Sequence, residues 1–258
     1  MIARSDGVAI AWEEHGAGAP LLLIHGLGYA RWGWEPVVDG LAERYRVLLF
    51  DNRGVGESDA PPGPYSARQL AEDAVAVLAA AGVERAHVIG TSLGGMAAQE
   101  LALGWPERVH RLVLACTTPG GAGAHPMPER TQKLIAAAPT LAPEAALRRF
   151  VENALGEPRP ELVERIVAHR LATAQPLEAW LAQAAAGVTF DAFERVGEIS
   201  APTLLLTGTA DAVVDKRNSD LLAERIAGAR VERFPRAGHL FFWEQPDRFV
   251  ELVSGFLG

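Results

Sequence analysis

Ser92 is the residue whose surroundings first suggest chemistry. It lies in the stretch AHVIGTSLGG, residues 86–95, with a glycine two places before it and another two places after it. A serine held at a sharp turn between a strand and a helix can act as a nucleophile, although the same letters also occur in ordinary glycine-rich connections. A nucleophilic serine needs a base, a group that orients the base, and donors for an oxyanion, so the remaining sequence must supply these.

His239 is the candidate base among the seven histidines. It follows Gly238 between a short strand-like run, residues 231–234, and the C-terminal helical segment. The apolar residues 240–242 would keep bulk water away from its imidazole. The other histidines flank strands, lie in connections or face outward from predicted helices, positions typical of structural or solvated histidines; the role of His125, in a Gly/Pro-rich stretch, stays open.

Asp211 is the candidate group that orients His239. It lies just beyond the apolar run Leu204–Leu206, where a carboxylate can accept the Nδ1–H of an imidazole and leave Nε2 free to take the serine proton. Asp215 is the alternative acid, four residues further on. Because it stands at the start of a predicted helix, an N-cap role is expected for it instead.

The predicted oxyanion donors are backbone amides. The strand-like run 21–24 leads into His25-Gly26-Leu27-Gly28, and a sharp turn at these glycines would direct the Leu27 amide toward the space beside Ser92. The Leu93 amide, directly after the serine, is the second donor. Two amides directed at one point form an oxyanion hole for acyl transfer.

The candidate residues follow short apolar runs, which alternate with helical patterns. Runs without period-two alternation are typical of parallel strands buried on both faces. The sequence therefore predicts an α/β fold with a mostly parallel central sheet flanked by helices. Residues 8–13 alternate more clearly and are predicted as an antiparallel edge strand. The other predicted strands are 21–24, 47–50, 88–89, 112–115 and 203–206, and helices are predicted near 66–81, 93–103 and 215–226.

Residues 120–195 interrupt the alternation, because this stretch contains helical patterns after a Gly/Pro-rich entry and no strand-like run. We predict a helical lid at 120–195, inserted into a core made of residues 1–119 and 196–258. Helices are expected near 144–151, 161–167 and 176–186. An insertion at the carboxyl ends of the strands would cover a site there.

Composition excludes several classes of protein. The 258 residues carry a net charge of −8, which argues against nucleic-acid binding. The one cysteine, Cys116, cannot form an intrachain disulfide and is expected to be a buried, inert thiol. No apolar run approaches a membrane span, and no signal peptide is recognisable, so a cytoplasmic protein is expected. No cofactor or metal is expected, because dinucleotide and P-loop glycine patterns are incomplete and no metal-ligand spacing occurs.

The order Ser92, Asp211, His239 resembles that of the α/β-hydrolase family. His25-Gly26-Leu27-Gly28 and residues 51–59, DNRGVGESD, also resemble family motifs, the second of them D-x-R-G-x-G-x-S. The resemblance covers nearly the whole chain and is greatest to small esterases and 3-oxoadipate enol-lactonases. It implies an acyl-enzyme mechanism on an ester or lactone. Perhydrolase or haloperoxidase-like activity, C–C bond hydrolysis and a hydrolase-like ligand receptor remain alternatives.

A small-molecule substrate is expected, but its identity and the oligomeric state do not follow from the sequence. Within residues 51–59, a buried Asp–Arg arrangement that fixes the loop is expected for Asp51, Arg53 and Asp59, instead of catalysis. An acidic substrate would require a cation at the pocket, for which Arg31, Arg130, Lys133 and Arg148 are candidates, although surface positions are expected for them. The candidate pocket residues are Tyr29, Trp32, Met127, Trp180, Leu240 and Phe241.

Overall fold

A computed structural model describes residues 1–258 of the protein. Eight strands form one sheet, in the order β1-β2-β4-β3-β5-β6-β7-β8, and the neighbouring strands from β4 to β8 are parallel. The α/β-hydrolase fold predicted from the sequence is therefore confirmed. The strands are β1 (Ile2–Ser5), β2 (Val8–His15), β3 (Ala19–Ile24), β4 (Tyr45–Phe50), β5 (Ala86–Thr91), β6 (Val109–Ala115), β7 (Thr203–Gly208) and β8 (Arg230–Phe234).

The central strands are apolar throughout because helices cover both faces of the sheet. Side chains on one face, such as Leu22 and Val88, pack with α2 (Ala67–Ala80), α3 (Leu93–Gly104) and α8 (Arg217–Arg225). Those on the other face, such as Leu23 and Ile89, pack with α1 (Glu35–Ala42), α9 (Phe241–Glu244) and α10 (Pro246–Leu257). The sheet is thus the middle layer of a three-layer fold.

Helix α2 shows how local sequence sets an element's bounds. Ser66 Oγ accepts a hydrogen bond from the amide of Gln69, and Gln69 Oε1 accepts one from the amide of Ser66, which forms a capping box. After the helix ends, Gly82 has a φ of 67°, a conformation that glycine adopts without a steric cost. The predicted limits of this helix agree with the structure to within one residue at each end.

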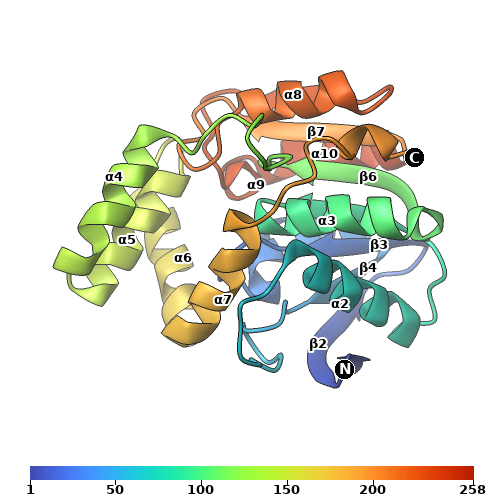
Figure 1. Ribbon diagram of the computed structural model, residues 1–258, viewed down its shortest axis with the longest axis horizontal. Coiled ribbons are helices and arrows are strands. Elements are labelled where there is room, and N and C mark those ends of the chain that lie inside the picture. Colours follow the sequence, from blue (N-terminus) through green and yellow to red (C-terminus); the bar gives the residue numbers. More distant parts are fainter.

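Only helices and connections lie between β6 and β7, apart from one isolated bridge between Gly120 and Asp191. The predicted lid contains α4 (Glu129–Ala137), α5 (Pro143–Ala154), α6 (Pro160–Ala172) and α7 (Leu177–Val188). The helices gather at one end of the sheet (Figure 1), where α7 packs against α3 and the buried faces of α5 and α6 join the core on the other side. This is the end toward which β6 and β7 run, so the predicted lid stands over the carboxyl ends of the parallel strands.

The N-terminal part of the sheet differs from the prediction. Strand β2 is antiparallel to its neighbours, as expected, but it is not the edge strand, because β1 pairs with it from Ile2 to Ser5. Strand β1 is only four residues long and has no apolar run, so its sequence carried no strand signal. Helix α1 was also absent from the prediction. No helix of the structure is long and apolar enough to span a membrane.

Candidate active site

Ser92 occupies the sharp turn between β5 and α3. Its φ of 55° and ψ of −120° lie outside the ordinary regions for a side-chain-bearing residue, a conformation that costs about 1–3 kcal/mol. Two hydrogen bonds hold the backbone there. The Ser92 amide donates to the Ala115 carbonyl at 2.9 Å, and Thr117 Oγ1 donates to the Ser92 carbonyl at 2.8 Å. The end of β6 and the residues that follow it thus help to offset the strain of the turn after β5.

Gly90 and Gly94 permit the close approach of the strand and the helix at this turn. A Cβ atom on Gly94 would lie 2.1 Å from the Ile24 carbonyl oxygen, and one on Gly90 would lie 2.4 Å from the Gly94 carbonyl oxygen. Neither backbone oxygen can rotate away as a flexible side chain could. Both positions flanking Ser92 therefore require glycine, which explains the G-x-S-x-G spacing physically.

Asp211 and His239 are brought together at the same edge of the sheet. The Nδ1 atom of His239 lies 2.8 Å from Asp211 Oδ2, and both side chains are buried. The other carboxylate oxygen, Oδ1, accepts hydrogen bonds from the amides of Val213 at 2.8 Å and Val214 at 3.0 Å. These amides fix the carboxylate, so Oδ2 can orient the imidazole.

The electrostatic surroundings of His239 favour its protonated form. Burial of the imidazole opposes protonation, but the negative charge of Asp211 and its hydrogen bond outweigh burial, and the pKa of His239 is raised well above its ordinary value. Cys116 acts in the same direction, through its charge and a hydrogen bond. A base with a raised pKa, beside a buried carboxylate, is suited to take a proton from a hydroxyl group.

The structure places Asp215 away from this pair. Its carboxylate forms a salt bridge with Arg217, and its Oδ1 accepts a hydrogen bond from the Arg217 amide at 3.0 Å. Arg217 is the first residue of α8, so Asp215 satisfies an amide at the start of the helix although Lys216 is the capping residue. Of the two candidate acids, only Asp211 contacts His239.

Cys116 is a further residue at this site. It is buried, as expected, with a backbone φ of 41° directly after β6. Its Sγ atom, the His239 ring and the Asp211 carboxylate offer three ligand atoms within 4.8 Å of one another. Such a set could bind a thiophilic metal ion, but the ion would compete with the hydrogen bond that joins Asp211 to His239. The sequence spacing could not show this group, because its members follow three different strands.

The loop after β3 supplies the candidate oxyanion donors. A Cβ atom on Gly26 would lie 3.5 Å from Ser92 Oγ, so this loop passes directly beside the serine. The amides of Leu27 and Leu93 donate to no protein acceptor, whereas the neighbouring Gly28 amide donates to Gln183 Oε1 at 3.1 Å. These two amides are therefore free to donate to an oxyanion, and the oxyanion hole stays a prediction.

His25 holds this loop in place. Its Nδ1 accepts a hydrogen bond from the Gly26 amide at 2.7 Å, while its carbonyl accepts one from Asn52 Nδ2 at 2.8 Å. Burial lowers the pKa of His25 to about 3, so the ring is neutral and can accept. His25 therefore has a structural role in the loop.

No hydrogen bond joins Ser92 Oγ to His239 in this structure. The two residues are linked indirectly, through Ala115 and Cys116 at the end of β6. The His239 ring lies beside Cys116, and the carbonyl of Ala115, the preceding residue, accepts from the Ser92 amide. Catalytic hydrogen bonds are often long before a substrate binds. The arrangement nevertheless places a candidate nucleophile, base and orienting acid after β5, β8 and β7, at the same edge of the sheet.

Comparison with known proteins identifies the family. Residues 19–246 match the model of the alpha/beta hydrolase fold family. The chain belongs to the alpha/beta hydrolase fold family. It is 36% identical to a provisionally named carbamate hydrolase, RutD, of Azorhizobium caulinodans, over 99% of this chain and 97% of the relative. It is 31% identical to the pimeloyl-[acyl-carrier protein] methyl ester esterase of Aeromonas hydrophila, over 97% of this chain and all of that one.

A solved structure is similar along the whole chain. Est816, described as an N-acyl homoserine lactone degrading enzyme, superposes with a TM-score of 0.86 at 31% identity, covering 99% of this chain and 100% of that one. These relatives act on different bonds but share the hydrolase class. The protein is accordingly a hydrolase.

Two of the predicted pocket residues of this hydrolase lie on the loop beside the oxyanion donors. Tyr29 stacks on His25 with ring centroids 4.7 Å apart. Trp32 stacks on His169 of α6 at 4.8 Å, and its Nε1 donates to Thr173 Oγ1 at 2.9 Å. These contacts join the loop to the lid and leave the two aromatic residues at the boundary between lid and core.

The other predicted pocket residues are more dispersed. Leu240 directly follows His239 and is buried. Phe241 is fully buried and stacks on Phe234 at 4.4 Å, which places it within the hydrophobic core. Trp180 is half-buried on α7, and Met127 is 42% exposed before α4.

The candidate cations for an acidic substrate are paired or exposed. Arg31 contacts Glu13, Asp51 and Glu57, so its charge is already compensated. Lys133 pairs with Glu129, Arg148 pairs with Glu164, and Arg130 is exposed. Lys133 and Arg130 are exposed as expected, whereas the Arg31 side chain is only 15% exposed and so is not a surface group.

The residue 51–59 segment has a structural role, but its partners differ from those expected. Asp51 pairs with Arg31, while Arg53 forms a buried two-bond contact with Asp73 of α2, with distances of 2.7 and 2.6 Å. Asp59 Oδ2 accepts from the Ala9 amide at 2.8 Å. Each charged residue thus joins this loop to another element, and Asp51 and Arg53 are not paired with each other.

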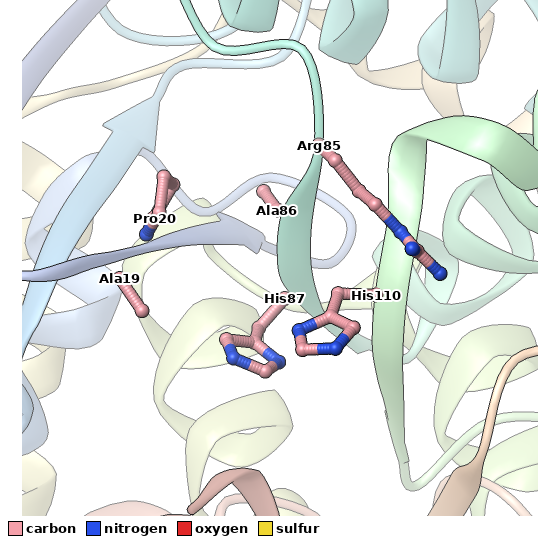
Figure 2. A pocket seen from close by; sticks show the side chains of 6 residues that line it. All are labelled: Ala19, Pro20, Arg85, Ala86, His87 and His110. Atoms are coloured by element: carbon pink, nitrogen blue, oxygen red, sulfur yellow. The ribbon is translucent and has the colours of Figure 1, made fainter.

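A hollow at the opposite end of the sheet is unrelated to this site. Arg85, His87 and His110 border it together with the amino ends of β3 and β5 (Figure 2). Burial lowers the pKa of His87 to about 4, with the nearby His110 and Arg111 acting in the same direction. Ligands of open α/β sheets bind outside the carboxyl ends of the strands, where Ser92 lies.

Proposed function

We propose that the protein is a serine hydrolase that cleaves a carboxylic ester or a lactone through an acyl-enzyme. Ser92 Oγ attacks the carbonyl carbon, while His239 Nε2 takes the serine proton. The developing oxyanion accepts hydrogen bonds from the amides of Leu27 and Leu93. Loss of one such donor typically costs about 2.7–4 kcal/mol of transition-state stabilisation.

Collapse of the tetrahedral intermediate breaks the bond to the leaving oxygen, which takes the proton from His239. In an ester the alcohol then departs, whereas in a lactone it stays attached to the acyl group. Water next attacks the acyl-enzyme with His239 as base, and the returning proton releases Ser92. Asp211 keeps the His239 Nδ1 proton in place throughout, which leaves Nε2 available.

The observation that carries this proposal is the strained Ser92 turn, which lies at the same edge of the sheet as a buried Asp211–His239 contact of 2.8 Å. Strain at a serine has no structural use that an alanine or glycine could not serve equally well. The named activities of the esterase and lactonase relatives support the same bond classes. Residues 120–195 are proposed to act as the lid of this site, since they stand over the carboxyl ends of the strands.

Replacement of the serine tests the proposal. Ser92→Ala should abolish turnover of p-nitrophenyl acetate and of a simple lactone while the fold stays intact by circular dichroism. Ser200→Ala, at an exposed position, is the matched control and should retain wild-type turnover. Full turnover by Ser92→Ala would reject the proposed nucleophile.

A further inference from the structure

Arg170 has surroundings unlike those of the other lid arginines. It lies in the last turn of α6, and its guanidinium extends to the loop that carries the candidate oxyanion donors. A Cβ atom on Gly28 would lie 2.9 Å from one terminal nitrogen of Arg170 and 3.0 Å from the other. The guanidinium carbon lies 4.9 Å from the centre of the Tyr29 ring. Arg170 thus reaches from the lid to the loop that passes beside Ser92.

Arg170 has no acidic partner. Arg148 and Arg165 of the lid bind Glu164 and Glu35, and Arg195, just after the lid helices, binds Glu100. The other unpaired lid arginines, at positions 130, 149 and 159, are exposed to solvent. No carboxylate, carbonyl or hydroxyl group accepts a hydrogen bond from the Arg170 guanidinium, although the chain carries 32 acidic residues. Its side chain is only partly exposed, so water cannot surround the charge fully. An uncompensated cation remains at this boundary.

The position of Arg170 is close enough to matter for a bound substrate. Gly26 of the same loop touches Ser92, and Gly28, two residues further, touches Arg170. Two residues of chain span at most about 7 Å, so the guanidinium lies on the order of 10 Å from the serine hydroxyl. That separation corresponds to the length of a short acyl chain.

The stacking on Tyr29 also leaves Arg170 able to bind. Cation–π contact engages the face of a guanidinium, whereas hydrogen bonding to a carboxylate uses its N–H edges. A carboxylate can therefore form two parallel hydrogen bonds with Arg170 while the stacking persists. Lysine could not reproduce this planar, two-bond arrangement.

We propose that Arg170 binds a free carboxylate of the substrate, so that this enzyme prefers esters or lactones that carry a second, ionised carboxyl group. The inference rests on the proposed function, because it assigns the substrate class of the Ser92 site. Hydrolysis of such a substrate consumes one water and releases a dicarboxylic acid and an alcohol, or a hydroxy diacid from a lactone. The alternative is that Arg170 only packs the lid against the oxyanion loop.

The test compares matched substrates. Monomethyl succinate, adipate and suberate are each assayed beside the same ester with its free carboxyl converted to a carboxamide, and acid release is followed in a pH-stat. For the best chain length, the wild-type enzyme should prefer the carboxylate by about 10-fold or more in kcat/KM, as expected for hydrogen bonds to a charged group. The preference should arise mainly from a lower KM.

Substitution of the arginine should remove that preference. Arg170→Gln should lower the ratio of kcat/KM for the carboxylate to that for the carboxamide by about 10–100-fold, and Arg170→Lys should lower it less. Arg165→Gln is the control, since Arg165 also lies on α6 but pairs with Glu35, and its ratio should equal that of the wild type. Should Arg170→Gln fail to fold, competitive inhibition of the wild type by adipate and not by adipamide replaces it.

The outcomes separate this inference from the proposed function. A wild-type ratio near one, or equal losses on both substrates in Arg170→Gln, would overturn the carboxylate site in favour of the packing role. If Ser92→Ala loses all turnover but the wild-type ratio of kcat/KM for carboxylate over carboxamide is near one, only the role of Arg170 is rejected. Turnover that persists in Ser92→Ala would reject the proposed nucleophile, whatever the ratio.

Discussion

Asp211→Asn isolates the orienting role of the carboxylate with little change in shape. Oδ1 of Asp211 accepts hydrogen bonds from two amides, those of Val213 and Val214, while Oδ2 faces His239 Nδ1. An asparagine keeps the two amide contacts only if its oxygen replaces Oδ1. Its NH₂ group then points at Nδ1, which must accept instead of donating. The proton of the neutral imidazole moves to Nε2, and Nε2 can no longer take the serine proton.

The magnitude follows from that change of tautomer. In a well-studied serine protease triad the same substitution lowers kcat about 10⁴-fold, equivalent to roughly 5.4 kcal/mol at 1.36 kcal/mol per factor of ten. The reverse orientation of the asparagine is unfavourable, because its NH₂ group would then face the two amide donors of Val213 and Val214. We therefore expect kcat for p-nitrophenyl acetate to fall by about 10³–10⁴-fold, with little change in KM.

The pH profile provides a second readout. His239 acts as a base only when neutral, so kcat/KM should rise with pH as the imidazole loses its proton. Asp211 raises the pKa of His239 in the folded protein, which places this rise above the ordinary value of 6.5. In Asp211→Asn, the rise of the remaining kcat/KM with pH should occur at lower pH, because the carboxylate that raises the pKa of His239 is gone. By linkage, the stability from the Asp211–His239 contact is present below pH 6.5 and is lost as pH increases through the raised pKa.

Asp215→Asn is the matched control, since Asp215 contacts Arg217 and not the imidazole. Its kcat should stay within about threefold of the wild type, as for a surface ion pair. A larger loss in Asp215→Asn than in Asp211→Asn would refute the assignment of the acid. Retention of more than a tenth of wild-type kcat by Asp211→Asn would refute the tautomer reasoning.

Two further predictions concern the turn and the thiol. Gly94→Ala should destabilise the protein by about 1–3 kcal/mol in urea unfolding, because its Cβ would meet a backbone oxygen at 2.1 Å. Gly255→Ala is the control and should be neutral or slightly stabilising, because no atom lies within 4 Å of its added Cβ. Equal stabilities of the two variants would contradict this reasoning. Cys116→Ala should move the rise of kcat/KM to lower pH, because Cys116 raises the pKa of His239; an unchanged profile would show that the thiol does not influence the imidazole.

Much of the fold was predictable because its signals are local. Strands β3 to β7 have apolar runs with turn residues beside them, and the glycines around Ser92 reflect a steric need within a few residues. Helix α2 begins at a serine with glutamine three residues later, a capping pattern visible in the sequence. The candidate residues Ser92, Asp211 and His239 could be ordered along the chain because each follows a strand.

The remainder depends on contacts between distant segments. Arg53 pairs with Asp73 and not with Asp51, a choice set by how α2 packs on the sheet. From the sequence alone, Cys116 is predicted only to be a buried core residue. Its proximity to Asp211 and His239 depends on how the ends of β6, β7 and β8 are placed in the sheet. Arg170 has no sequence signal, since its distinction is to lie unpaired and partly buried against the loop that carries Gly28 and Tyr29.

Labelling with a serine-reactive phosphonate tests the central claim most directly. After incubation with a fluorophosphonate, intact-mass analysis should show a single adduct per chain, and peptide mapping should place it on Ser92. Ser92→Ala should take up no label under the same conditions. An adduct on a different residue, or equal labelling of Ser92→Ala, would contradict the proposal that Ser92 is the nucleophile of this hydrolase.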